Sequence, residues 1–141
     1  MKQFELLPHT ADIRLKVYGR DLKELFINAV KALAFLLKEE VDQKKTRAAQ
    51  QTVSATSNDI PNLLVDFLSE ILTRSEIHNI VYPEVEDMSI QPLRTTHSAE
   101  AILIGYPVEK FDRDVKAVTY HEVDIERNDE GMLETLLVFD I

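Results

Sequence analysis

The fold is decided by the last nine residues of the chain, Leu133-Glu134-Thr135-Leu136-Leu137-Val138-Phe139-Asp140-Ile141. Apolar side chains fill most of these positions, without the alternation expected of a strand that has one face in water. A nearly continuous apolar run is typical of a strand that is covered on both faces. We therefore predict an interior strand of a sheet. Its end brings the side-chain carboxylate of Asp140 next to the terminal carboxylate of Ile141.

Two amphipathic helices are predicted to pack on this sheet. The first follows Asp21, which can form a capping box with Glu24, and runs to about Lys38. The second opens at Asn58-Asp59 and has Pro61 in its first turn, where a missing N–H costs nothing. In both segments, apolar residues recur at steps of three and four, as in a helix packed on a core. These residues are Leu22, Leu25, Phe26, Ala29, Leu33, Leu36 and Leu37, and then Ile60, Leu63, Leu64, Phe67, Leu68, Ile71 and Leu72.

Several other segments have strand character, and four of the strand-like segments follow one another without a helix between them. The predicted strands are Phe4–Leu7, Asp12–Tyr18, Ala49–Thr56, Glu84–Leu93, His97–Gly105, Val115–Arg127 and Met132–Ile141. With 141 residues and 45% hydrophobic content, the chain fits one globular domain, residues 1–141. We predict an α+β fold in which the two helices pack on a mixed, mostly antiparallel β-sheet.

Composition excludes several classes of function. Sixteen Lys and Arg against 25 Asp and Glu give a formal charge of −9, which opposes direct binding of nucleic acid. The absence of cysteine excludes disulfides, thiolate zinc sites and cysteine nucleophiles. Only three glycines occur, and none forms a phosphate-binding loop. No apolar stretch is long enough for a membrane span and no signal peptide is recognisable, so we expect a cytoplasmic protein.

Asp12 is a candidate for a third oxygen donor beside the C-terminus. It stands in Pro8-His9-Thr10-Ala11-Asp12-Ile13, where an aspartate is more often a turn or cap residue than a metal ligand. If its strand pairs with the last strand, Asp12, Asp140 and the terminal carboxylate of Ile141 converge. Two such charges about 4 Å apart repel by roughly 1 kcal/mol in water, and by more near a protein surface, unless a cation compensates them. Oxygen donors of this kind suit Ca²⁺ or Mg²⁺.

Several short motifs occur in a fixed order along the chain. They are His9-Thr10-Ala11-Asp12-Ile13, Tyr18-Gly19 with the helix start Leu22 to Phe26, Leu64-Val65-Asp66-Phe67-Leu68-Ser69-Glu70-Ile71-Leu72, Val115-Lys116-Ala117-Val118-Thr119-Tyr120-His121 and Phe139-Asp140-Ile141. Each motif alone is weakly specific. The ordered set resembles the archease family over nearly the whole chain.

The resemblance implies a function and a set of residues. Archeases are small acidic accessory proteins that activate the GTP-dependent RNA ligase of the RtcB type in tRNA splicing and RNA repair. They promote guanylylation of the ligase and its multiple turnover, and they are not themselves enzymes. By resemblance, Asp12, Asp140 and the carboxylate of Ile141 would bind a divalent metal ion, with calcium expected and magnesium or manganese as alternatives. Lys116 would be a functional residue in ligase activation.

Two other functions are compatible with these residues. The chain could be a metal-dependent hydrolase that uses Asp12 and Asp140, or a metal-stabilised scaffold protein for another partner. A hydrolase turns over its substrate alone, whereas an activator is inert until a ligase is added. We leave His9 and His121 out of the metal shell, because a lone histidine is more often structural and the sequence lacks the ligand spacing of a zinc site.

Overall fold

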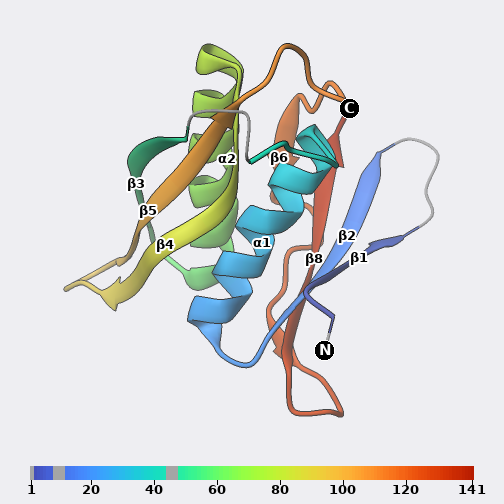
Figure 1. Cartoon of the computed structure of the whole chain (residues 1–141). Helices are drawn as coiled ribbons and strands as arrows, with labels where there is room; N and C mark the ends of the chain where they lie inside the picture. Colours follow the sequence, from blue (N-terminus) through green and yellow to red (C-terminus); the bar gives the residue numbers. More distant parts are fainter. Residues whose placement is uncertain (1, 8–11, 44–47) are drawn as a thin grey trace.

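The computed structural model of the protein describes residues 2–7, 12–43 and 48–141 (Figure 1). In chain order its elements are β1 (Phe4–Leu7), β2 (Ile13–Gly19), α1 (Leu22–Leu37), β3 (Ala49–Ser57), α2 (Ile60–His78), β4 (Ile80–Pro92), β5 (His97–Pro107), β6 (Ala117–Thr119), β7 (Glu126–Arg127) and β8 (Leu133–Asp140). The predicted α+β class and its two helices are confirmed. No helix within the described ranges is both long and apolar enough to cross a membrane.

The strands divide between two sheets. One sheet has the order β1-β2-β8-β6, with β7 also paired to β8, and the other has the order β3-β5-β4. All strand pairs in the described part of the chain are antiparallel. The sequence predicted one mixed, mostly antiparallel sheet. It did not show that β3, β4 and β5 pair only with one another.

The apolar C-terminal strand lies inside its sheet, as predicted. β8 pairs with β2 on one side, where Ile13 is opposite Phe139, and with β6 on the other, where Val118 is opposite the same phenylalanine. Leu137 and Phe139 are fully buried, and Val138 on the other face is almost fully buried. The end of β8 is therefore fixed from both sides.

The predicted strand Val115–Arg127 is wrong over most of its length. Only Ala117–Thr119 and Glu126–Arg127 pair with β8, and a turn lies between them. Glu122 in this turn has a φ of 60°, a left-handed conformation that an extended strand does not contain. The apolar residues that suggested a strand pack on the core from a loop instead: Val115, Val123 and Ile125.

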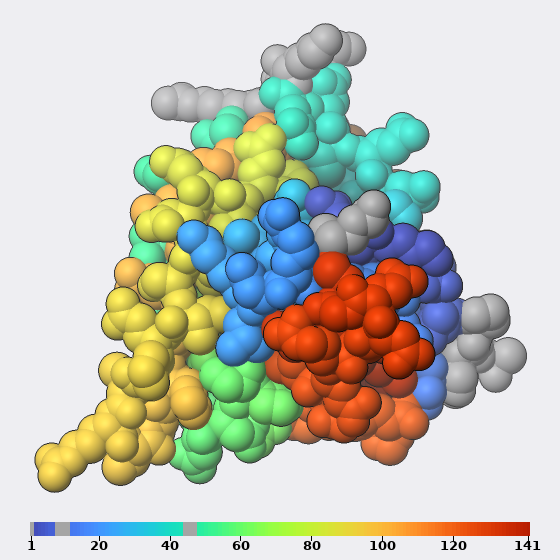
Figure 2. Space-filling model, turned by 90° about the horizontal axis from the view of Figure 1, so that it is seen from below, coloured from blue at the N-terminus to red at the C-terminus, as the bar shows by residue number. Residues whose placement is uncertain are grey.

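The two helices join the sheets. α1 packs against β2 and β4, and α2 packs against β3 and β6, so each helix touches both sheets (Figure 1). Buried side chains from both helices and both sheets form one continuous core cluster. The tip of the β4–β5 hairpin projects from the body, and the turn between β7 and β8 lies beside the start of α1 (Figure 2).

The N-terminus of α1 is capped much as predicted. The backbone N–H of Glu24 donates to Asp21 Oδ1 at 2.8 Å, which is the first half of a capping box. In the second half, the Glu24 carboxylate accepts from the backbone N–H of Arg20 at 3.0 Å, one residue before the cap. A cap of this kind is typically worth about 1 kcal/mol.

The loop between β5 and β6 closes the C-terminal end of α1. The backbone N–H of Asp112 donates to the carbonyl of Leu37 at 2.7 Å, and the Asp112 carboxylate accepts from the backbone N–H of Glu39 at 2.8 Å. Arg113 Nη1 donates to the carbonyl of Leu36 at 3.1 Å. Carbonyl groups that a helix end leaves without partners are thereby satisfied by this loop.

Asp112 should make the stability of this region depend on pH. The hydrogen bond from Glu39 N–H, followed by the nearby Lys38 ammonium, lowers the pKa of the Asp112 carboxyl below its usual 3.8. A lowered pKa in the folded state stabilises the protein above the unfolded value, and this contribution is lost as the pH falls through the folded pKa. Asp112→Asn should therefore lower the melting temperature near neutral pH, with a difference that shrinks below pH 3.8. Asp114→Asn, in the same loop, is the control, and an equal effect there would contradict this assignment.

Candidate metal centre

Three segments distant in sequence meet at the same end of the five-stranded sheet, where β2 and β6 begin and β8 ends. Ile13 pairs with Phe139, and Ala117 pairs with Asp140. Extending the β2–β8 register by one residue places Asp12 opposite Asp140, where Cα atoms in an antiparallel pair lie about 4.5–5.5 Å apart and side chains share a face. The C-terminus marks this end of the molecule in Figure 1. The pairing of the Asp12 strand with the last strand is thus part of the fold.

Lys116 lies at the same end of the sheet and is held there by a main-chain hydrogen bond. Its backbone N–H donates to the carbonyl of Asp140 at 2.8 Å, directly before β6 begins. The Lys116 side chain is exposed, and the structure gives its ammonium group no ion pair with any residue that it describes. A compact positive charge on a flexible stem is therefore available at this end of the sheet for an anionic group.

Asp12 and Asp140 differ in environment. The side chain of Asp12 is only 19% exposed, and its Oδ1 atom is shielded from solvent. Asp140 is exposed, and Ile141 is 49% exposed. This end of the sheet thus combines one carboxylate that is largely buried with one that faces solvent. Pro8, His9, Thr10 and Ala11, which precede Asp12, lie outside the described residues.

A cation is already present beside Asp12. Arg14, two residues further along β2 and on the same face, places its Nε atom 3.5 Å from Asp12 Oδ1. Its Nη1 atom lies 2.8 Å from Oε2 of Glu122 in the turn after β6. Arg14 therefore bridges two acids that are more than a hundred positions apart in the sequence.

The donor set suits a hard divalent cation. Asp12, Asp140 and the Ile141 carboxylate supply only oxygen atoms, as calcium and magnesium prefer. Within residues 2–7, 12–43 and 48–141, no group of three or more His, Cys, Asp or Glu side chains is arranged to hold a metal ion. The predicted set contains only two such side chains and takes its third donor from the main chain. It therefore differs in kind from a cluster of three acidic side chains.

The end of β6 is also tied to α2. The hydroxyl of Tyr120 donates a short hydrogen bond to Oδ1 of Asp66, and this bond, followed by burial, raises the pKa of Tyr120. Asp66 therefore has a hydrogen-bond partner within the chain. His121 is exposed, with its Nε2 atom 3.9 Å from Glu122, and it stays outside the candidate centre.

Arg14 and Glu122 were not predicted as site residues. Arg14 could have been found, because residues two apart on a strand share a face and Asp12 was already a candidate. No sequence signal leads to Glu122, because its position depends on the left-handed backbone of one turn.

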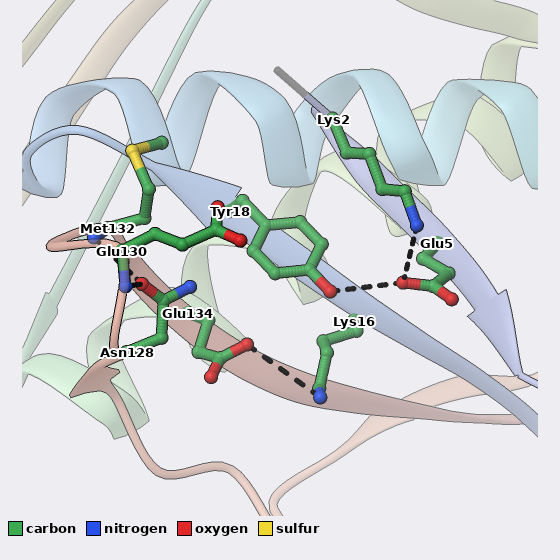
Figure 3. A network of polar contacts seen from close by, with 8 residues as sticks. All are labelled: Lys2, Glu5, Lys16, Tyr18, Asn128, Glu130, Met132 and Glu134. Atoms are coloured by element: carbon green, nitrogen blue, oxygen red, sulfur yellow. Dashed lines mark hydrogen bonds and ion pairs between the residues drawn. The ribbon is translucent and has the colours of Figure 1, made fainter.

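A second polar region lies at the other end of the same sheet, six residues along β2 from Asp12 and thus roughly 20 Å away. Here Lys2 and Tyr18 both contact Glu5, and Lys16 pairs with Glu134 at 3.7 Å (Figure 3). Burial, followed by the hydrogen bond to Glu5, raises the pKa of Tyr18 to about 12. An open groove of about 750 Å³ is lined by Lys2, Tyr18, Arg20, Asn128, Glu130, Met132 and Glu134.

The polar groups of this groove have structural roles. Asn128 Oδ1 accepts from the backbone N–H groups of Glu130 and Met132, which closes the turn before β8. Arg20 pairs with Glu24 at the start of α1 at 2.7 Å. This groove is therefore a surface between paired charges, and none of its lining residues belongs to the predicted metal site.

The chain matches the model of the archease protein family over residues 4–141. A protein archease from Methanosarcina acetivorans is 34% identical over 142 residues, and the match covers 97% of this chain and 95% of that protein. The protein archease of Pyrococcus abyssi is 32% identical over 148 residues, with 100% of both chains covered. The solution structure of Methanobacterium thermoautotrophicum protein 1598 has a TM-score of 0.79 at 28% identity and full coverage of both chains. The similarity in sequence and fold thus extends over the whole chain.

Proposed function

Because the chain belongs to the archease family, we propose that it is a non-enzymatic activator of an RNA ligase of the RtcB type. In this role it promotes guanylylation of the GTP-dependent ligase and its repeated turnover in tRNA splicing and RNA repair. We place the activating site at the end of the five-stranded sheet where Asp12, Lys116 and Asp140 lie.

The convergence of these three residues is the observation that supports this site. They are far apart in the sequence, and the pairing of β2 and β6 with β8 brings them to one end of the sheet. If these residues only stabilised the fold, an exposed lysine beside an exposed aspartate would not be required at this end of the sheet. The proposed site shares no residue with the groove that Tyr18 and Glu134 line.

We further propose that Asp12, Asp140 and the carboxylate of Ile141 bind one divalent cation, with calcium first and magnesium or manganese as alternatives. When bound, the metal would offset the mutual repulsion of these anions and fix their positions. Lys116 would then act next to this centre as a point charge toward an anionic group of the ligase or its substrate.

The charge of the chain supports a protein partner. With 25 acidic and 16 basic residues, the chain has no general attraction to nucleic acid, and we expect the RNA to be bound by the ligase. A net charge of −9 favours encounter with a basic surface on the ligase. The cysteine-free sequence is also compatible with the cytoplasmic location that we propose.

A guanylylation assay tests the proposal. A ligase of this type from the same organism, incubated with GTP, should form the ligase–guanylate intermediate faster when the protein is added. The protein alone should leave nucleotide and RNA substrates unchanged. Metal-dependent hydrolysis by the protein alone would favour a hydrolase that uses Asp12 and Asp140. No hydrolysis and no stimulation would leave a metal-stabilised scaffold for another partner.

A further inference from the structure

We propose that Arg14 and Glu122 set the metal affinity of the candidate centre. Arg14 acts as a built-in cation that competes with the metal for Asp12, and Glu122 holds Arg14 partly away from Asp12. This inference rests on the metal site proposed above and adds two residues to it. It assigns to these residues control of affinity, and neither is a metal ligand.

The contacts of Arg14 place its guanidinium between Asp12 and Glu122. Its Nε atom and Asp12 Oδ1 lie 3.5 Å apart, and both atoms are shielded from solvent. The side chains of Arg14 and Asp12 are 23% and 19% exposed, so their attraction is screened less than that of a surface pair. The guanidinium therefore offsets part of the charge that Asp12 would offer to a metal ion.

Glu122 competes with Asp12 for the same guanidinium. Its Oε2 atom lies 2.8 Å from Arg14 Nη1, a shorter distance than the one between Arg14 and Asp12. Glu122 is a non-glycine residue with a φ of 60°, which is an unfavourable backbone conformation that surrounding contacts must maintain. The ion pair with Arg14 is one such contact, and it keeps the guanidinium between the two acids.

The two residues should act on the metal in opposite directions. Affinity in oxygen-ligand sites rises with the number of anionic groups, and a fixed cation beside one ligand lowers it. Loss of Arg14 should strengthen metal binding. Loss of Glu122 should weaken it, because Arg14 then pairs with Asp12 alone.

Calcium titration by calorimetry on the full chain tests this inference. Arg14→Gln should bind Ca²⁺ about tenfold more tightly than the parent, because one nearby positive charge is removed. Glu122→Gln should bind about threefold more weakly, within the range of coupled neighbours. The double variant should bind as tightly as Arg14→Gln, because Glu122 acts through Arg14. Arg14→Lys keeps the charge but not the two-pronged contact, and it should fall between the parent and Arg14→Gln.

Lys16→Gln is the matched control. Lys16 is on the same face of β2, two residues further from Asp12 than Arg14, and it pairs with Glu134. The Lys16→Gln substitution removes one positive charge, as Arg14→Gln does, but at a position further from the centre. The Ca²⁺ affinity of this variant should stay within about twofold of the parent, since distant exposed charges are screened.

The outcomes separate this inference from the metal site itself. Unchanged or weaker binding by both Arg14 variants, beside normal binding by the parent, would overturn the inference alone. An equal gain in Lys16→Gln would also overturn it, because net charge would then account for the effect. If neither the parent nor Arg14→Gln binds Ca²⁺, the proposed metal site fails and the inference fails with it.

Discussion

Asp12→Ala is expected to abolish stimulation of the ligase. Asp12 is the inward carboxylate of the candidate centre, and its loss removes one of only three proposed oxygen donors. Even groups that merely support metal ligands are typically worth about 10–100-fold in metal affinity or activity, so loss of a ligand should cost about 100-fold or more. The rate of ligase guanylylation with each variant measures this effect.

Lys116→Ala should produce the same loss by a different route. Lys116 is exposed, so the truncation opens no cavity and should change the free energy of unfolding by less than about 0.5 kcal/mol. Metal binding should persist in this variant, because its main-chain contact with Asp140 does not involve the side chain. Loss of stimulation with metal binding retained would assign Lys116 to the step after metal binding.

The fold of both variants needs a matched check. Asp12→Ala leaves Arg14 with its Glu122 pair but removes its second acid, so we also include Asp12→Asn, which keeps the shape of the side chain. Asp129→Ala and Lys23→Ala change the same residue types at exposed positions, in the turn before β8 and in the first turn of α1, beyond the opposite ends of β8 and β2 from Asp140 and Asp12. Full stimulation by Asp12→Ala and Lys116→Ala, or equal loss in the controls, would contradict the proposed site.

Extension of the chain beyond Ile141 is expected to remove metal binding while the fold persists. A few added residues convert the terminal carboxylate into a neutral amide, which deletes one anionic donor of three. Ile141 is 49% exposed and follows the last strand, so added residues have room at this end of the sheet. The Ca²⁺ affinity of the extended form should fall by about 100-fold, by the same argument as for Asp12.

An equal extension at the N-terminus is the control for this experiment. It adds the same mass but leaves the C-terminal carboxylate intact, so Ca²⁺ affinity should match the parent. Thermal unfolding of both forms checks that the five-stranded sheet persists. Unchanged affinity in the C-terminally extended form would show that the terminus is not a ligand.

The elements that the sequence predicted well have strong local patterns. The apolar run that became β8 indicated an interior strand, and the stripes in α1 and α2 marked both helices. Asp21 identified the start of α1 because N-capping is a local interaction. The approach of Asp12 to Asp140 could also be anticipated, since it needs only that the second strand pair with the last.

The parts that the sequence did not predict depend on contacts between distant residues. Val115, Val123 and Ile125 have strand-like character but reach the core from a loop, because Glu122 turns the chain between them. The separation of β3, β4 and β5 into their own sheet is a choice of pairing partner, and side-chain alternation does not reveal it. The link from Arg14 to Glu122 follows from both the sheet and that turn.

The most direct measurement is the number of RNA molecules joined per ligase molecule when the ligase is limiting. We expect each ligase to join several RNA molecules when the protein is present, and markedly fewer when it is absent or replaced by Asp12→Ala. Equal turnover with and without the protein, using a ligase from the same organism, would contradict the proposed function.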